Sequence, residues 1–400
     1  MKKKKITIGI IIYLLSSLIS YTVFAKIDGS GRSIPGVIVD DGGDEVTDGS
    51  GEVMLLEIDP AAPKDQECPL NGQYYTQVER EAWEKRRPLY VMIENAPDAR
   101  PQSGLSRADV VYEAIAEGGV TRYGALYYCD AQKQDVILAP VRSARTYFVD
   151  WASGYNKPLY VHVGGANIPG RADALGQITK YGWNQNNDVN QFSVGYPTFR
   201  RNYDRLNGQE IATEHTMESF TEALWKVGED RGWTNTSPDR KFGTKIVKGT
   251  EWSDGFTPWT FEEEVAEKGE VLKASYDFWS GYGQYDVIWD YSVEQDVYLR
   301  TLGGKEDVDL NNNQRISAAN VVVMFTLETG PIDELKHMLY KTVGRGKVIV
   351  FNHGNVTEGF WSKAQRVSEI RFTNKFGKEI PLARGKTWIS VVSNTNKVTY

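Results

Sequence analysis

The chain has 400 residues and a formal net charge of −7, with 40% hydrophobic and 12% aromatic residues. This length exceeds one typical core and leaves room for two globular domains. The hydrophobic content excludes wholesale disorder. The acidic balance argues against general nucleic-acid binding, which needs a basic surface to displace counterions from phosphates. We therefore expect a folded protein without a nucleic-acid partner.

The N-terminus has the pattern of an export signal. Four lysines at positions 2–5 precede an apolar run at 6–25, and such lysines stay on the cytoplasmic side. The run is roughly long enough to span a hydrocarbon core of about 30 Å, yet its end at Ala25 also resembles a cleavage site. Both outcomes stay open. Residues 1–25 are either a single-pass signal anchor that places the body outside the cell membrane, or a signal peptide whose cleavage near Ala25 yields a secreted protein.

The rest of the chain divides by composition. Residues 26–66 are rich in Gly, Asp and Pro and lack an apolar period, so we expect a flexible acidic spacer. Next, apolar strands alternate with helical patterns, which favours helices on the faces of a sheet. The predicted strands are 89–93, 110–115, 121–128 and 159–163, and the predicted helices are 143–151 and 171–181.

After Gly232 short β-type runs dominate, separated by turn residues. They are 244–247, 271–276, 285–291, 297–302, 320–325, 347–351 and 387–392. We therefore predict an α+β protein, with a mixed α/β domain at 67–237 and a smaller β-rich domain at 238–400.

The two cysteines, Cys68 and Cys129, both fall in the first predicted domain. An exported chain meets an oxidising compartment, where such a pair forms a disulfide. We predict this disulfide, with two buried free thiols as the alternative.

A series of motifs runs through both predicted domains. In the first they are RPLYVMIEN at 87–95, ARPQSGL at 99–105, YEA at 112–114, EGGVTR at 117–122 and PVRSAR at 140–145. In the second they are 316–323, TVG at 342–344, GKEI at 377–380 and GKTWI at 385–389. Through them the chain resembles the YerB-like putative lipoprotein family. The resemblance implies two domains of unknown function on the outer face of the membrane, and no reaction. The chain departs from the family in lacking a lipidated cysteine after the apolar run, and in the residues around His215.

Two arginines stand at the start of a predicted helix. Arg142 and Arg145 flank Ser143, which is placed to cap the helix. Because helix N-termini carry partial positive charge, arginines there need an acidic group opposite them. A ligand phosphate or carboxylate would serve, since guanidinium groups bind both bidentately. Glu113 or Glu117 of the chain itself would also serve.

Further polar residues lie near strand ends. Glu113 and Glu117 are four apart and Arg122 follows, which permits an acid–base pair or a charged network that supports the sheet. Asn95, Arg100 and Gln102 follow the first strand, where α/β sheets gather ligands, although loop polarity alone would explain them.

The histidines offer weaker signals. His162 ends a strand before two glycines, where it could reach a cleft or be a hydrogen-bonded core histidine. His353 fits a solvated hairpin turn. No histidine pair has metal-ligand spacing, and neither a nucleotide fingerprint nor a nucleophile elbow is present in the sequence. We therefore predict no metal and no cofactor.

Our first hypothesis is a non-catalytic cell-envelope protein that binds an anionic small molecule or cell-wall fragment in its first domain. The predicted ligand-binding residues are Asn95, Arg100, Gln102, Glu113, Glu117, Arg122, Arg142, Arg145 and His162. One alternative is a hydrolase or transferase that uses Glu113 or Glu117 with His162. Another is a scaffold for membrane protein complexes, with envelope proteins as partners.

Overall fold

The computed structural model describes residues 53–184, 186–263 and 266–400. The predicted export segment 1–25 and most of the predicted spacer lie outside the described residues. Of the helices in the described part of the chain, none is long and apolar enough to cross a membrane. The body starts to pack before residue 67, because Leu55 is buried and its amide donates to the carbonyl of Lys133 at 2.7 Å.

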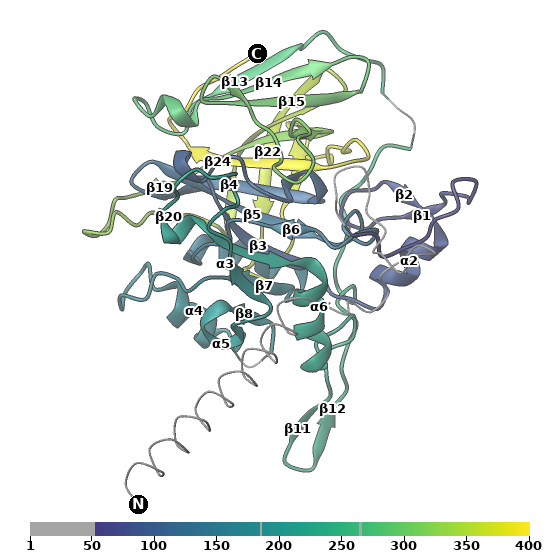
Figure 1. Cartoon of the computed structure of the whole chain (residues 1–400). Helices are drawn as coiled ribbons and strands as arrows, with labels where there is room; N and C mark the ends of the chain where they lie inside the picture. The colour runs from purple at the N-terminus through teal and green to yellow at the C-terminus, as the bar shows by residue number, and fades with distance from the viewer. Residues whose placement is uncertain (1–52, 185, 264–265) are drawn as a thin grey trace, which may run out of the picture.

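A ten-stranded sheet runs through the molecule (Figure 1). In spatial order its strands are β23 (Arg371–Asn374), β22 (Asn355–Lys363), β21 (Gly344–Asn352), β18 (Asn320–Thr326), β24 (Thr387–Ser393), β4 (Val110–Glu117), β5 (Val120–Tyr127), β3 (Leu89–Glu94), β7 (Leu159–His162) and β8 (Asp188–Asn190). The first five come from the second half of the chain, residues 238–400, and the last five from the first half, residues 53–237.

The two halves join where β24 pairs with β4 in parallel, with Trp388 opposite Val111 and Ser390 opposite Glu113. Strands β4, β18 and β24 are almost wholly buried, as their near-continuous apolar sequences predict. The structure is therefore sheet-rich, and the halves share one sheet. The predicted boundary near Pro238 falls between the last helix and a hairpin and stays a prediction.

A second sheet packs over this join. It contains β16 (Lys305–Glu306), β15 (Val297–Leu302), β14 (Val287–Ser292), β13 (Lys273–Tyr276) and β25 (Val398–Thr399), with β17 (Ser317–Ala318) paired to β15. Burial alternates strictly along β14 and β15 because one face meets the large sheet. Trp289 of β14 lies 5.5 Å from Trp388 of β24, measured between ring centroids.

The helices gather toward the β7–β8 end of the large sheet (Figure 1). They are α3 (Thr146–Ala152), α4 (Ala174–Lys180), α5 (Gln191–Val194) and α6 (Thr221–Asp230), and α2 (Gln77–Trp83) lies to one side. Short 3₁₀ turns span Pro97–Ala99, Leu105–Arg107, Ser153–Tyr155, Thr213–His215 and Gly283–Tyr285. Helix α3 begins later than predicted. Its N-cap is Arg145, without a side-chain cap hydrogen bond, so the expected cap by Ser143 is wrong.

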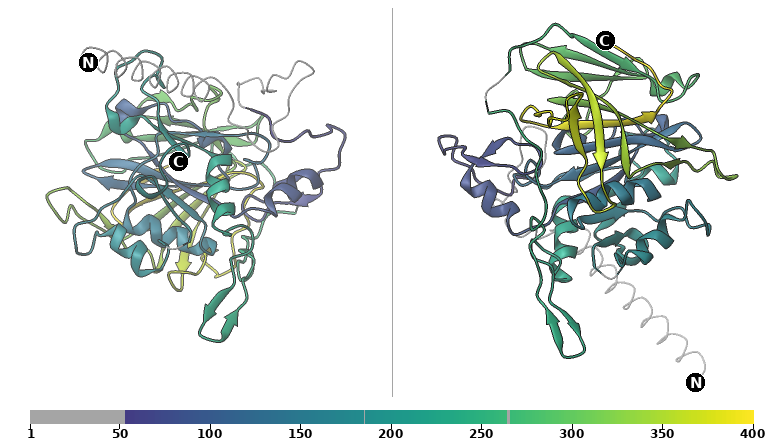
Figure 2. Two further views of the ribbon diagram at one scale, coloured as in Figure 1. Left: turned by 60° about the horizontal axis from the view of Figure 1, so that its bottom comes forward. Right: turned by 180° about the vertical axis from the view of Figure 1, so that it is seen from behind.

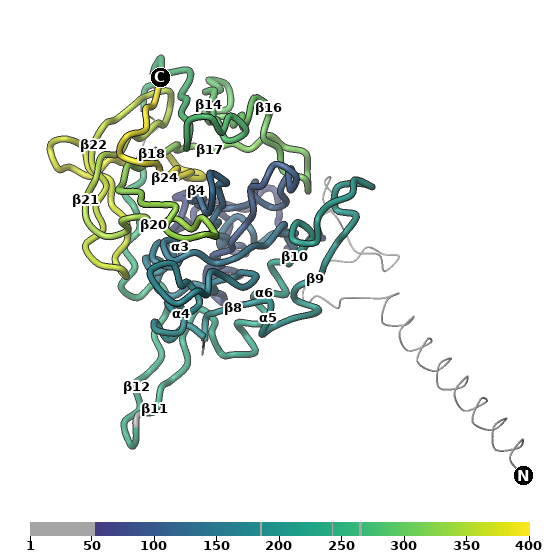
Figure 3. Tube along the Cα trace, turned by 90° about the vertical axis from the view of Figure 1, so that its left-hand side faces the viewer, coloured from purple at the N-terminus to yellow at the C-terminus, as the bar shows by residue number. Residues whose placement is uncertain are grey.

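Smaller sheets complete the fold. They are β1 (Gln66–Glu67) with β2 (Tyr74–Tyr75), β6 (Ile137–Leu138) with β10 (Met217–Phe220) and β9 (Phe199–Arg201), β11 (Arg240–Phe242) with β12 (Lys245–Val247), and β19 (Glu328–Thr329) with β20 (Leu339–Tyr340). The β11–β12 hairpin projects from the body in every view (Figures 1, 2 and 3). The predicted disulfide is confirmed: Cys68 and Cys129 are bonded, with their Cα atoms 6.1 Å apart.

Candidate functional site

Two of the predicted arginines bind one carboxylate of the protein itself. Arg122 Nη2 lies 2.8 Å from Oε1 of Glu117, and Arg145 Nη2 lies 2.6 Å from Oε2. Both guanidinium groups are buried. Burial raises the pKa of Glu117, but Arg122 and Arg145 outweigh it and lower that pKa to about 2. Of the two internal acids considered from the sequence, Glu117 is therefore the one that faces Arg145.

Arg142 is in a different situation. Its Nε lies 3.0 Å from Oε1 of Glu94, whose other oxygen lies 2.7 Å from Nδ1 of His215. The hydrogen bond with Glu94 raises the pKa of His215. The terminal amino groups of Arg142 have no hydrogen-bond acceptor among the described residues, and its side chain is 23% exposed. This guanidinium keeps donors for a further partner.

Glu113 serves another purpose. Its carboxylate lies 2.7 Å from Nη2 of Arg300 and accepts from the indole of Trp388 at 3.2 Å. Glu113 and Arg300 are fully buried, so their ion pair ties β4 to the second sheet across the join. The register of β4 shifts between Ile115 and Glu117. The two glutamates therefore bind different arginines.

The loop after β3 is held by its own hydrogen bonds. Arg100 Nε and Gln102 Nε2 both donate to Oδ1 of Asn95, at 3.0 and 3.1 Å. The amide of Asn95 donates to Thr121 Oγ1 at 2.7 Å, and Arg100 Nη1 donates to the carbonyl of Gln284 at 2.8 Å. These residues connect the loop to the sheet and to the second half.

The three histidines named from the sequence, His162, His215 and His353, are all buried. His162 Nδ1 lies 2.6 Å from the carbonyl oxygen of Gly164, and its Nε2 lies 2.6 Å from Oδ1 of Asp188. His353 lies in the β21–β22 turn between Glu262 and Asp296, 2.9 Å from a carboxylate oxygen of each. The expectation of a solvated His353 is wrong, because the segment around residue 262 covers the turn.

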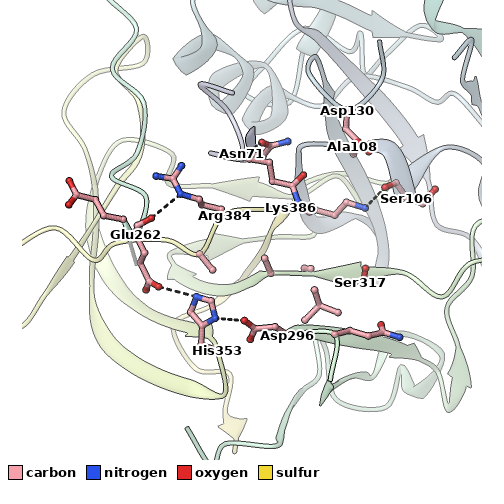
Figure 4. A pocket seen from close by; sticks show the side chains of 18 residues that line it. Asn71, Ser106, Ala108, Asp130, Glu262, Asp296, Ser317, His353, Arg384 and Lys386 are labelled. Atoms are coloured by element: carbon pink, nitrogen blue, oxygen red, sulfur yellow. Dashed lines mark hydrogen bonds and ion pairs between the residues drawn. The ribbon is translucent and has the colours of Figure 1, made fainter. Parts of the chain in front are cut away.

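A cavity of about 450 Å³ opens where the two halves meet, and we call it the junction pocket (Figure 4). Its lining includes Asn71, Ser106 and Asp130 from the first half, and Glu262, Glu263, Asp296, His353, Arg384 and Lys386 from the second. It lies away from the predicted arginines, since none of these lines it.

Lys386 lines the junction pocket and connects the second half to the first. Its Nζ donates to the carbonyl oxygens of Leu105 and Ser106, both at 2.8 Å. Burial lowers the pKa of Lys386 to about 8, although Asp130 and Asp309 oppose this effect. An ammonium group has three donors, so one N–H remains beyond these two carbonyls.

The acidic lining residues fall into two groups. Glu262 and Asp296 are occupied by His353, whereas the carboxylates of Asp130 and Glu263 accept no hydrogen bond from any residue in the described ranges. Arg384 is held through Nε and Nη1, which donate to the carbonyl of Glu262 and to Glu67, and its Nη2 has no acceptor among the described residues. The charged groups left for a ligand therefore include the third N–H of Lys386, Nη2 of Arg384 and two carboxylates.

Comparison with known proteins assigns the family. Residues 75–234 match the N-terminal domain, and residues 276–389 the C-terminal domain, of "Protein of unknown function (DUF3048)". The chain belongs to the DUF3048 family. It is 28% identical over 348 residues to "Putative lipoprotein YerB" of Bacillus subtilis (strain 168), which covers 83% of this chain and 88% of that protein. The crystal structure of YerB from Bacillus subtilis superposes with a TM-score of 0.65 at 26% identity, covering 84% of this chain and 99% of that one.

The family expected from the motifs is thus confirmed, and the relative found in both comparisons is YerB of Bacillus subtilis. Sequence reasoning on this DUF3048 protein did not single out Lys386 or Asp130 as site residues. Two local signals were present: Lys386 directly precedes an apolar strand, and Asp130 follows Cys129. Neither signal shows that the two side chains line one cavity, because more than 250 residues separate them.

Proposed function

We propose that this DUF3048 protein is a membrane-associated envelope protein that binds a small zwitterionic molecule, of the peptide or cell-wall-fragment class, in the junction pocket. The observation that carries the proposal is the meeting of Lys386, Asp130 and Glu263 around one cavity, with hydrogen-bonding capacity unused. Its volume is within the usual range for small-molecule sites. The lipoprotein relative supports the envelope location.

The charges indicate the ligand's chemistry. An anionic group would accept the remaining N–H of Lys386, and an ammonium group would donate to Asp130 or Glu263. A purely anionic ligand would face both carboxylates unpaired, which is costly in a partly enclosed site. A molecule with both groups satisfies all three residues.

The dipeptide alanyl-alanine is a suitable probe, compared with its N-acetyl and C-amide forms. The free dipeptide should raise the midpoint of thermal unfolding. Each capped form lacks one charge and should bind about tenfold more weakly or worse, since hydrogen bonds to charged groups contribute about 1.5–3 kcal/mol. Equal binding of all three forms, or binding of none, would contradict the proposal.

Variants locate the binding. Asp130→Asn and Glu263→Gln should weaken dipeptide binding with little loss of stability, because neither carboxylate has a partner in the described fold. Glu267→Gln is the matched control, since Glu267 is an exposed carboxylate nearby that does not line the cavity. Loss of binding in the control as well would show that the effect is general electrostatics.

The affinity should also depend on pH. Lys386 holds an anion only when protonated, and its pKa is about 8. Affinity for the free dipeptide should therefore fall as pH rises through 8. The amino group of the dipeptide also titrates near pH 8, so the N-acetyl form, which keeps only the anion, isolates the contribution of Lys386, and its weaker affinity should fall over the same interval.

A second candidate is the site first predicted from the sequence, an anion held by Arg142. The terminal amino groups of Arg142, free of acceptors in the described structure, favour it. Inorganic phosphate should then raise the unfolding midpoint of the wild type and of Asp130→Asn, but not of Arg142→Ala. Binding by the wider set from Asn95 to His162 stays a prediction.

The other hypotheses gain less from the geometry. A catalytic role for His162 would require a ring nitrogen that reaches a substrate, and both nitrogens have partners. The scaffold hypothesis is consistent with the internal pairing of Glu113 and Glu117.

A further inference from the structure

The β11–β12 hairpin stands apart from the body (Figures 1 and 2). Beyond the two strands, toward the body, its ladder continues to an isolated bridge between Thr236 and Glu251. From Thr236 to the end of β11 at Phe242 there are seven residues, which span about 23 Å at the rise of a strand. The tip is a tight turn at Gly243, where φ is +63°. A two-stranded ladder gains little stability by itself, and Arg240 at its base lies 6.0 Å from the ring centroid of Trp233, so a contact outside the body would explain how far the strands extend beyond that point.

The hairpin differs from the rest of the protein in charge. The whole chain has a net charge of −7, yet residues 240–248 contain four cations and no acid. The cations are Arg240, Lys241, Lys245 and Lys248. Lys248 pairs with Asp239 at the base, at 2.8 Å, and Arg240 also lies at the base, over the ring of Trp233, which leaves Lys241 and Lys245 toward the tip.

Apolar side chains lie among these cations. Ile246 and Val247 are 56% and 42% exposed. Ile246 lies opposite Lys241, and Val247 lies opposite Arg240. Since successive residues of a strand point to opposite sides, each face of the hairpin presents a cation beside an apolar side chain.

We infer that the β11–β12 hairpin docks on an anionic lipid surface. The cations bind lipid phosphates, and Ile246 with Val247 enters the boundary between headgroups and acyl chains, as in interfacial elements that combine basic and apolar side chains. An acidic protein surface would suit the cations but would leave two apolar side chains exposed at a polar contact. The inference rests on the envelope location proposed above, and it is independent of the junction pocket.

The contribution of the lysines to lipid binding is large enough to measure. Each lysine near an anionic membrane strengthens the attraction roughly fivefold, and the effect falls off within a Debye length of about 8–10 Å. Reversal of Lys241 and Lys245 should therefore weaken the contact by well over tenfold. Higher salt should weaken it as well.

A dye at the tip tests the contact in the full chain reconstituted into vesicles. The two native cysteines form a disulfide, so Thr244→Cys provides a single thiol for an environment-sensitive fluorophore. Emission at this position should shift to shorter wavelength in phosphatidylglycerol vesicles and remain near its aqueous value in phosphatidylcholine vesicles. Adding Lys241→Glu and Lys245→Glu should remove the shift in phosphatidylglycerol.

The control carries the dye at Glu294→Cys. Glu294 is an exposed residue in the turn between β14 and β15, and this sheet lies at the opposite end of the molecule (Figure 1). It should show no shift in either lipid. The inference is overturned by no shift at Thr244→Cys, by equal shifts in both lipids, by an equal shift at Glu294→Cys, or by a shift that survives charge reversal. Dipeptide binding by the charge-reversed chain is expected to be normal, so this inference and the proposed function can fail separately.

Discussion

Arg142 and Arg145 lie three residues apart, yet their surroundings differ. Arg145 is almost fully buried and gives Nε and Nη2 to Glu117 and Nη1 to the carbonyl of Ala144. Arg142 is partly exposed and shares Glu94 with His215. A structural role is therefore stronger for Arg145, and a role toward a ligand is stronger for Arg142.

This difference predicts unequal effects on stability. Arg145→Ala leaves Glu117 with one partner fewer in a buried site and should cost about 3 kcal/mol, the lower end for a broken buried pair. Arg142→Ala should cost about 1 kcal/mol, because Glu94 keeps His215 and solvent reaches the site. Urea unfolding without ligand measures both values. A loss of about 3 kcal/mol in Arg142→Ala too would contradict the anion site at Arg142.

Glu117 predicts a pH dependence. Its pKa is lowered in the folded protein from 4.5 to about 2, so the folded state binds fewer protons than the unfolded state between these values. The stabilisation is complete above pH 4.5 and is lost as pH falls toward 2. The shift corresponds to about 3 kcal/mol. Unfolding free energies of wild type and Glu117→Gln should therefore converge over this interval, and a constant difference would contradict the assignment.

At the scale of elements, the disulfide joins the segment before β2 to the end of β5. The residues that follow β5 are also held by Asp109. Its carboxylate accepts hydrogen bonds from the backbone amides of Tyr128 and Cys129, at 2.7 and 3.0 Å. Burial and the charge of Asp130 raise the pKa of Asp109 to about 7. The chain near the junction pocket is thus held by a covalent link and a buried carboxylate.

Removing the covalent link should have a large effect. The disulfide closes a separation of 61 residues, for which the chain-entropy estimate is about 4 kcal/mol. The double variant Cys68→Ala with Cys129→Ala should lose about this much unfolding free energy. The wild type in reducing buffer is the control and should lose a similar amount. A stability equal to the oxidised protein would show that strain or residual structure offsets the entropy.

At the scale of the whole molecule, the two family segments act as one structure. Strand β24 pairs with β4, and the buried Arg300–Glu113 pair connects the second sheet to the first half. Without the second half, β4 would be an open apolar edge, which favours aggregation. Glu113 would also lose its charged partner.

We therefore expect the separate halves to fail where the whole chain folds. Residues 53–237 expressed alone should aggregate, and co-expression with residues 238–400 should restore soluble protein. The whole chain should unfold in one cooperative transition by both fluorescence and circular dichroism. A soluble, cooperatively folded first half, or two separate transitions, would show that the halves are independent domains.

Local patterns in the sequence predicted most of the central strands. The apolar runs at 89–93, 110–115, 159–163 and 387–392 coincide with β3, β4, β7 and β24, because strand formation follows from side-chain periodicity and turn residues. The motifs identified the family, and the cysteine pair predicted the disulfide from the expected compartment. Helix α6, with buried residues spaced from Thr221 to Gly228, was missed although its amphipathic pattern is present.

Tertiary structure alone decided which charges meet. The sequence limited the partners of Arg145 to a ligand or a nearby glutamate, and packing assigned Glu117. It offered no means of pairing Glu113 with Arg300, 187 residues away. The parallel pairing of β4 with β24 and the junction pocket between Asp130 and Lys386 also result from contacts between residues that are distant in the sequence. Contacts between distant residues depend on how the sheets pack against each other, and the periodicity of a local segment does not specify this packing.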